Sequence, residues 1–208
     1  MPLDLLSRLK NESAACHTRL ENALDLMRDD LDRDEYIALL ERFYGYVAPW
    51  EAAVAACMPA SLGNFFDARR KAQLLAADLA ALTGETQRSA CVPHADSHDD
   101  LPRMRNIGDA FGSMYVMEGS TLGGRFIAPH VAERLDLAPG RGNAYFDGYG
   151  ARTGSMWNAF RETATASVPE HQYDDAVKAA IATFESLHAW LCPDSADVRL
   201  LQPAAGAV

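Results

Sequence analysis

The chain has 208 residues, of which 49% are hydrophobic and 23% are charged, as is usual for a folded globular protein. Its 19 Lys and Arg residues against 29 Asp and Glu residues give a formal net charge of −10. This acidity argues against functions that need a basic face, namely nucleic-acid binding and attachment to an anionic membrane surface.

Apolar residues recur at steps of three and four along most of the chain, which predicts helices and no strand. Asp32 is the expected N-cap of the second helix, Pro49 is expected to kink or split that helix, and Gly84 is expected to end the third. We find no repeat and no dividing linker, so we expect one all-α domain. The predicted helices, in chain order, cover residues 3–25, 33–57, 67–84, 104–135, 151–167 and 173–192, with loops over 84–102 and 136–150. The domain is expected to cover residues 1–192, and a weakly ordered tail is expected over 193–208.

We expect a cytoplasmic protein without a membrane segment. Charged residues interrupt the N-terminus where a signal peptide needs an apolar stretch, and no apolar run reaches the ~18 residues of a membrane span. The four cysteines stand singly, without a CxxC pair, which favours reduced thiols.

Four glycines of the longest predicted helix share one helical face. Gly108, Gly112, Gly119 and Gly123 are spaced four, seven and four residues apart. Each glycine inside a helix costs about 0.5–1 kcal/mol relative to alanine, so something must offset them. Close packing of two helices is one interpretation, and spacing alone favours it. A flat ligand lying against the backbone, with the helix kinked at its glycines, is the other.

A histidine in the first predicted helix shares its face with a lysine and a glutamate. His17 lies seven residues after Lys10 and four before Glu21. A neutral imidazole can coordinate iron while a nearby carboxylate accepts its other N–H, and a lysine two turns away can reach an anionic group of a ligand. The alternative, which spacing alone favours, is a surface histidine paired with Glu21 and a solvated lysine.

Three further motifs resemble functional sites, but each also has a purely structural interpretation. Cys91, His94 and His98 have the spacing of half a zinc site, and a solvated loop is the better reading because no second ligand pair follows. The segment Glu185–His188 has the Glu-x-x-His form used by di-iron bundles, but no second copy is present. The segment Arg69–Lys71 is a local basic patch, either a solvated helix face or a docking point for an electron-donor protein.

Two segments resemble bacterial haem oxygenases. Residues 115–124 (YVMEGSTLGG) resemble the signature of their distal helix, and residues 10–21 (KNESAACHTRLE) resemble their proximal helix. Residues 156–161 and 69–71 resemble the branch of this family that is associated with bacteriophytochromes. The resemblance extends over residues 3–192.

The resemblance implies an all-α fold with haem b between the first helix and the kinked, glycine-rich helix. Ser120 stands where the animal enzymes carry an aspartate, so the distal water network must be built differently. The site residues that the resemblance implies are His17 as iron ligand, Glu21 as its hydrogen-bond partner, Lys10, Tyr115 and Arg161 at the haem propionates, Gly119, Ser120 and Gly123 as the catalytic distal wall, and Gly124 as a further haem contact.

The implied activity is the cleavage of haem, which is both substrate and cofactor, to biliverdin, CO and Fe²⁺ with O₂ and electrons. The electrons would come from an external ferredoxin or NAD(P)H-dependent reductase, and a bacteriophytochrome would accept the product. A non-catalytic haem carrier or sensor on the same fold stays open as an alternative. A di-iron carboxylate bundle is a third candidate.

Overall fold

The computed structural model describes residues 4–138 and 140–193. Within these residues the secondary structure is helical and contains no strand, which confirms the predicted all-α fold. The expected tail lies outside the described residues, except for Pro193. The helices are α1 (Leu5–Leu24), α2 (Arg33–Cys57), α3 (Gly63–Asp67), α4 (Ala72–Thr83), α5 (Ile107–Arg134), α6 (Ala144–Asp147), α7 (Thr153–Ser167) and α8 (Tyr173–Leu191), with short 3-10 turns at Ala60–Leu62, Arg88–Cys91, Gly150–Arg152 and Glu170–Gln172.

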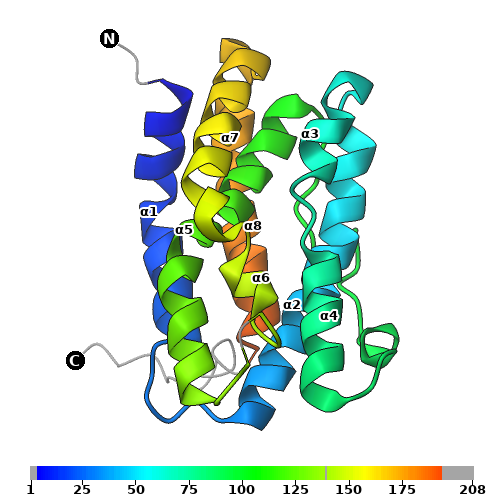
Figure 1. The fold of residues 1–208 in the computed structure, drawn as a ribbon. Helices are drawn as coiled ribbons and strands as arrows, with labels where there is room; N and C mark the ends of the chain where they lie inside the picture. The colour runs from blue at the N-terminus through cyan, green and yellow to red at the C-terminus, as the bar shows by residue number, and fades with distance from the viewer. Residues whose placement is uncertain (1–3, 139, 194–208) are drawn as a thin grey trace, which may run out of the picture.

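Helix α8 lies at the centre of the fold and packs most extensively against α5 and α1, while α2 packs against α4. Figure 1 shows α1, α7 and the lower half of α5 on one side of the molecule, and α2, α3 and α4 on the other. The upper half of α5 runs obliquely behind α7, whereas its lower half stands beside α1, so the helix changes direction along its length (Figure 1).

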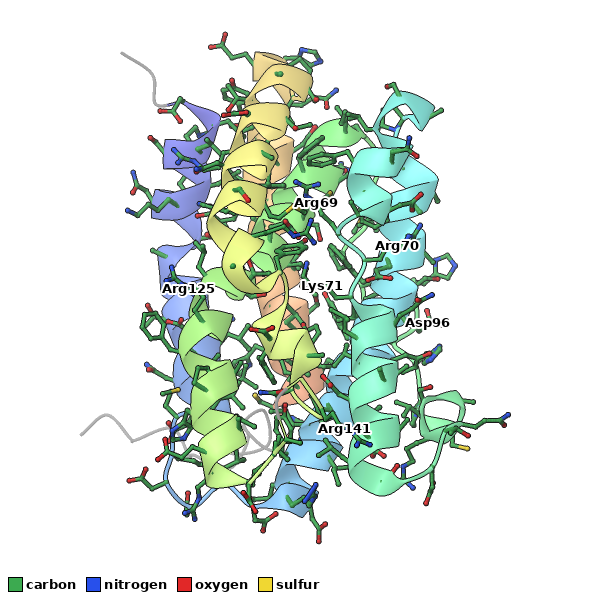
Figure 2. The ribbon with its side chains drawn as sticks, viewed as in Figure 1. Arg69, Arg70, Lys71, Asp96, Arg125 and Arg141 are labelled. Carbon is green, nitrogen blue, oxygen red and sulfur yellow. The ribbon has the colours of Figure 1, made fainter. Side chains whose placement is uncertain are left out.

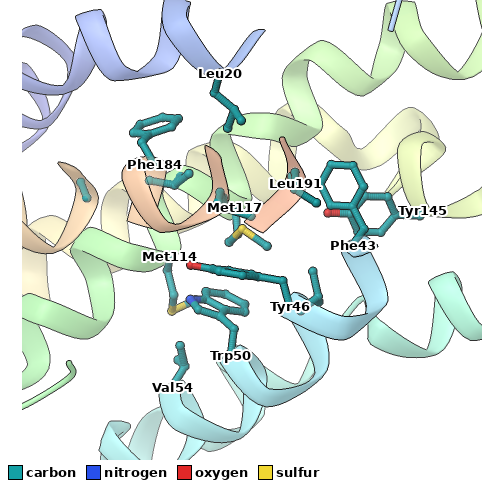
Figure 3. Packing of buried hydrophobic residues seen from close by; sticks show 14 of the residues in the cluster. Leu20, Phe43, Tyr46, Trp50, Val54, Met114, Met117, Tyr145, Phe184 and Leu191 are labelled. Atoms are coloured by element: carbon teal, nitrogen blue, oxygen red, sulfur yellow. The ribbon is translucent and has the colours of Figure 1, made fainter. Parts of the chain in front are cut away.

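The core joins α2, α5 and α8. Figure 3 shows Tyr46 and Trp50 of α2 beside Met114 and Met117 of α5, with Phe184 of α8 close by. Buried polar groups add specific links, since the Trp50 indole donates to Ser113 Oγ at 2.8 Å and Tyr46 pairs with the Ser186 hydroxyl at 2.6 Å. The three helices are therefore held by matched hydrogen bonds as well as by apolar burial.

Helix α2 begins as predicted and continues through its proline. Asp32 and Glu35 form a reciprocal capping box at its start. Pro49 does not split the helix, contrary to one of the two outcomes expected of it. Proline has no N–H for the carbonyl four residues earlier, and the N–H of Ala95 takes that place by donating to Gly45 O at 2.9 Å. The loop after α4 therefore satisfies the carbonyl that Pro49 leaves without its helical donor.

The predicted helix over residues 67–84 is wrong in its first part. The chain breaks after α3, and α4 begins only at Ala72. The carboxylate of Glu51, from α2, accepts hydrogen bonds from the backbone N–H groups of Lys71 and Ala72, which are unpaired donors at the start of α4. A distant side chain thus sets the start of α4.

The glycine-rich segment predicted as a loop over residues 136–150 contains the short helix α6. The buried carboxylate of Asp78, in α4, accepts from the N–H groups of Ala144 and Tyr145 at 2.9 and 2.8 Å. This contact fixes α6 against α4. Among the described residues, none of the helices is both long and apolar enough to cross a membrane.

Candidate functional site

A cavity of about 1020 Å³ lies between α1 and the glycine-rich part of α5, with residues of α6, α7 and α8 completing its walls. Ligand pockets have volumes of about 300–1,000 Å³, so this one is large enough for a bulky ligand. Of the predicted site residues, those that line it are Lys10, His17, Glu21, Tyr115, Gly119, Ser120, Gly123 and Arg161. Residues far apart in the sequence therefore meet around one space.

The four glycines of α5 divide into two pairs with different surroundings. A Cβ on Gly108 or Gly112 would collide with the backbone of Gln172 or Ala176, where α8 begins. A Cβ on Gly119 or Gly123 would find its nearest neighbour only at 4.0 Å, and both residues line the cavity. Helix packing explains the first pair, and an open wall facing a cavity explains the second.

Of the two predicted site residues next to these glycines, Ser120 lines the cavity and Gly124 does not. Gly124 is buried and does not line the cavity, because its missing side chain makes room for the carbonyl of Phe146 in α6. The structure therefore places Gly124 at a helix contact and not at the ligand space. Ser120 does line the cavity, and its hydroxyl donates to Met117 O at 2.9 Å.

His17 projects from α1 into the wall opposite the glycines. Its Nε2 lies 3.1 Å from Glu21 Oε1, and the two side chains are 52% and 63% exposed. The ring also packs against Phe184 of α8, with centroids 5.5 Å apart. The imidazole is paired as the spacing predicted, yet half of its surface faces open space where a ligand can reach it.

Two cations and a phenol occupy the part of the cavity between α1, α5 and α7. Lys10 and Arg161 are exposed at its wall, and Tyr115 is partly buried beside Trp157, with ring centroids 5.7 Å apart. Burial raises the pKa of Tyr115, and the positive charge of Arg161 opposes that rise. This corner can bind anionic groups such as carboxylates through charge-assisted hydrogen bonds.

The rest of the cavity wall is mostly apolar. Two of its residues, Met27 and Phe126, are large hydrophobic side chains that are 50% and 71% exposed. Contiguous exposed apolar surface often marks a binding site, and these two residues line the same cavity. Further apolar lining comes from Leu20, Leu24, Phe43, Met117, Ile127, Phe146, Phe184 and Leu187. The cavity therefore suits a largely apolar ligand that carries acidic groups at one edge.

The basic segment Arg69–Lys71 is not a surface patch, which corrects both interpretations offered for it. Arg69 and Lys71 are 5% and 6% exposed and lie close to α7 in Figure 2, whereas Arg70 is exposed and pairs with Asp67 at 2.8 Å. Lys71 Nζ lies 2.7 Å from Glu118 Oε1, and Arg69 Nε lies 3.3 Å from Glu118 Oε2. Local sequence does not reveal this burial, because a run of charged residues normally indicates a solvated face. The acidic partner of both buried cations is Glu118, the residue immediately before Gly119.

The Cys91, His94 and His98 segment has the contacts of an ordinary loop. Cys91 is exposed, the His94 ring packs near Tyr44, and His98 donates its backbone N–H to Asp96. In the described part of the chain, no group of three or more His, Cys, Asp or Glu residues is placed to hold a metal ion.

Comparisons with known proteins agree with this geometry. The family model described as heme oxygenase matches residues 3–192. A heme oxygenase of Xanthomonas campestris pv. campestris (strain 8004) is 27% identical over 168 residues, covering 79% of this chain and 93% of that protein.

Solved structures share the fold. The NO- and CO-bound heme oxygenase of Neisseria meningitidis has a TM-score of 0.71 at 22% identity, covering 99% of this chain and 96% of that one. The heme oxygenase of Leptospira interrogans has a TM-score of 0.69 at 16% identity, covering 92% of this chain and 100% of that one.

Proposed function

This chain belongs to the haem oxygenase family, and from that premise we propose that it binds one haem in the cavity between α1 and α5 and cleaves it with O₂ and electrons to biliverdin, CO and Fe²⁺. One observation carries the proposal: His17 and the open glycines Gly119 and Gly123 line two different walls of one cavity of about 1020 Å³. Haem, when bound, supplies both a redox-active iron and the porphyrin ring that is oxidised.

The residues present fit that group. A neutral imidazole can bind a metal through one ring nitrogen while a carboxylate accepts the N–H of the other, and Glu21 Oε1 lies 3.1 Å from His17 Nε2, close enough to orient the ring in this way. Lys10, Tyr115 and Arg161 gather on one side of the cavity, where they would pair with the two propionates. The apolar wall would cover the remainder of the ring and exclude water from it.

The second wall has a different role. Gly119 and Gly123 present backbone to the cavity, so a small ligand above the ring can lie close to α5 without meeting a side chain. The Ser120 hydroxyl is engaged with Met117 O, so Ser120 offers the cavity at most the acceptor side of its oxygen. Hydrogen-bond donors and steric access on this side of a haem pocket influence its chemistry, and Gly119 and Gly123 would keep this side open and poor in donors.

Two external partners belong to the proposal. Electrons would come from a ferredoxin or an NAD(P)H-dependent reductase, because the sequence shows no flavin, dinucleotide or iron–sulfur motif. Biliverdin would pass to a bacteriophytochrome, supported by the resemblance of residues 156–161 to that branch. Adding an apo-phytochrome to completed turnover mixtures should then give the absorbance of the assembled photoreceptor.

Stoichiometric hemin and a reductant test the enzymatic function. The haem complex, given O₂ and either ascorbate or reduced ferredoxin, should lose its Soret band and yield a product with the mass and absorbance of biliverdin. A haem carrier or sensor would instead keep its Soret band throughout. His17→Ala should abolish the imidazole-ligated spectrum, whereas His98→Ala, an exposed loop residue, should leave it intact. An unchanged spectrum in His17→Ala would refute the ligand assignment.

A further inference from the structure

We propose that Lys71 is a specificity-determining residue, whose buried positive charge makes the α5 side of the cavity favour an anionic small ligand over a neutral one. This inference rests on the proposed function, since the ligand in question is one that binds above the haem on the glycine wall. It concerns a side chain outside the proximal and distal helix segments, residues 10–21 and 115–124.

Lys71 is held in place by three acceptors. Its Nζ donates to Glu118 Oε1 at 2.7 Å, to Tyr149 OH at 3.1 Å and to Arg69 O at 3.2 Å. The lysine and glutamate side chains are 7% and 3% exposed. An ammonium has three donors, so all three are satisfied. The charge is therefore fixed in position beside Glu118, the residue before Gly119.

Lys71, Arg69 and Glu118 together keep a net positive charge, because two cations share one carboxylate. The Glu118 carboxylate is shared between Lys71 and Arg69, at 2.7 and 3.3 Å. Tyr149 stays a neutral phenol, because burial and the neighbouring Glu118 both raise its pKa. Glu51 is engaged by the N–H groups at the start of α4 and lies 3.8 Å from Arg70.

Lys71 is also the charged group that faces this side of the cavity. Among the described lining residues, the other charged or titratable side chains apart from tyrosine belong to α1, its N-cap Asp4, or α7. Glu118 and Arg69, which pair with each other beside Lys71, do not line the cavity. An anion on the α5 side of the cavity therefore has Lys71 as the charged residue of that wall, in surroundings where charges are weakly screened.

The experiment compares ligands of different charge on the ferric haem complex. Azide and imidazole are titrated by absorbance into wild type, Lys71→Met, Lys71→Arg and Lys178→Met. Lys178→Met is the matched control, because it removes the same charge from an exposed position on α8. Arg69 keeps its own bonds to Phe65 O and Met156 O, so Glu118 retains a cationic partner in Lys71→Met. If that variant yields no folded protein, Lys71→Gln replaces it.

We expect Lys71→Met to weaken azide by about three- to tenfold, as estimated for a charge several ångströms away in a partly buried site. Imidazole affinity should be unchanged, and Lys71→Arg and Lys178→Met should keep the wild-type ratio of azide to imidazole affinity. The inference is overturned if Lys71→Met leaves that ratio unchanged, if both ligands weaken together, or if Lys71→Arg loses the ratio as well. Failure to form any haem complex would instead overturn the proposed function.

Discussion

The glycines of α5 show how far a single residue type can be interpreted from sequence. Their spacing correctly placed Gly108, Gly112, Gly119 and Gly123 on a helix, but two explanations competed for all four. Helix packing accounts for Gly108 and Gly112, because the backbone of Gln172 and Ala176 faces them, whereas Gly119 and Gly123 face the open cavity that the ligand explanation requires. What lies opposite a glycine depends on tertiary structure, so spacing could not separate the pairs.

Alanine substitutions at these positions should have opposite effects. Gly112→Ala should lower the free energy of unfolding by roughly 1–3 kcal/mol, because its methyl group meets the Ala176 backbone. Gly119→Ala should raise that free energy of the haem-free protein by about 0.5–1 kcal/mol through better helix propensity. The same methyl group points into the cavity and should weaken hemin binding severalfold.

Urea unfolding and hemin titration measure the two effects. Gly63→Ala is a suitable control, since a Cβ there meets nothing within 4 Å and does not face the cavity. The division of the glycines would be wrong if Gly119→Ala destabilised the haem-free protein as Gly112→Ala does, or if it bound hemin like wild type.

At the scale of helices, local signals predicted most boundaries, and distant contacts explain the errors. Asp32 and Gly84 mark a start and an end within their own neighbourhood, and both are confirmed. The break before Ala72 depends on Glu51, twenty-one residues away, and on the burial of Lys71 against Glu118. No window of local sequence contains those partners, so the pattern of this charged, alanine-rich stretch predicts one continuous helix.

The start of α2 should make a pH-dependent contribution to stability. The ion pair with Arg28, at 2.6 Å, and the N–H of Asp32 lower the pKa of Glu35. A lowered carboxyl pKa means that the folded state binds fewer protons, so this stabilisation is present above the ordinary Glu value of 4.5 and is lost as the pH falls through the lowered value. Glu35→Gln should therefore lower the thermal midpoint near neutral pH and have progressively less effect below about pH 4.

Thermal unfolding of both proteins from pH 7 down to pH 3 measures this difference. Glu85→Gln is a control of the same charge change, because Glu85 is exposed and pairs with Arg88 only at 3.5 Å. A gap between wild type and Glu35→Gln that stays constant over the whole pH range would contradict the assignment.

At the scale of the molecule, the structure has a well-packed side and an open side. Helices α2 and α4 pack against each other, and α2 is tied to α5 and α8 by buried hydrogen bonds. Helix α1 and the lower half of α5 instead face each other across the cavity, where Lys10, His17 and Phe126 are exposed. Two walls of the cavity could be predicted from the sequence, because they are the faces singled out in α1 and α5. Its apolar sides from α6 and α8 could not, because Phe146 and Phe184 gave the same pattern as ordinary core residues.

Haem should therefore stabilise the two sides unequally. A ligand present at 100 times its dissociation constant stabilises the folded state by about 2.7 kcal/mol. Amides that exchange only through global unfolding should slow by the same factor wherever they lie in the chain. Amides that open locally should respond only where haem closes the structure. We expect hydrogen exchange on hemin binding to slow more in residues 5–24 and 119–134 than in residues 72–83 of α4.

Residues 72–83 serve as the internal reference, because none of them lines the cavity. In His17→Ala the excess protection of residues 5–24 should disappear, since the ligand no longer ties α1 to the opposite wall, while residues 119–134 should keep part of theirs through contact with the ring. Equal slowing in all three segments would place haem elsewhere, or would mean that α1 and α5 are already closed without it.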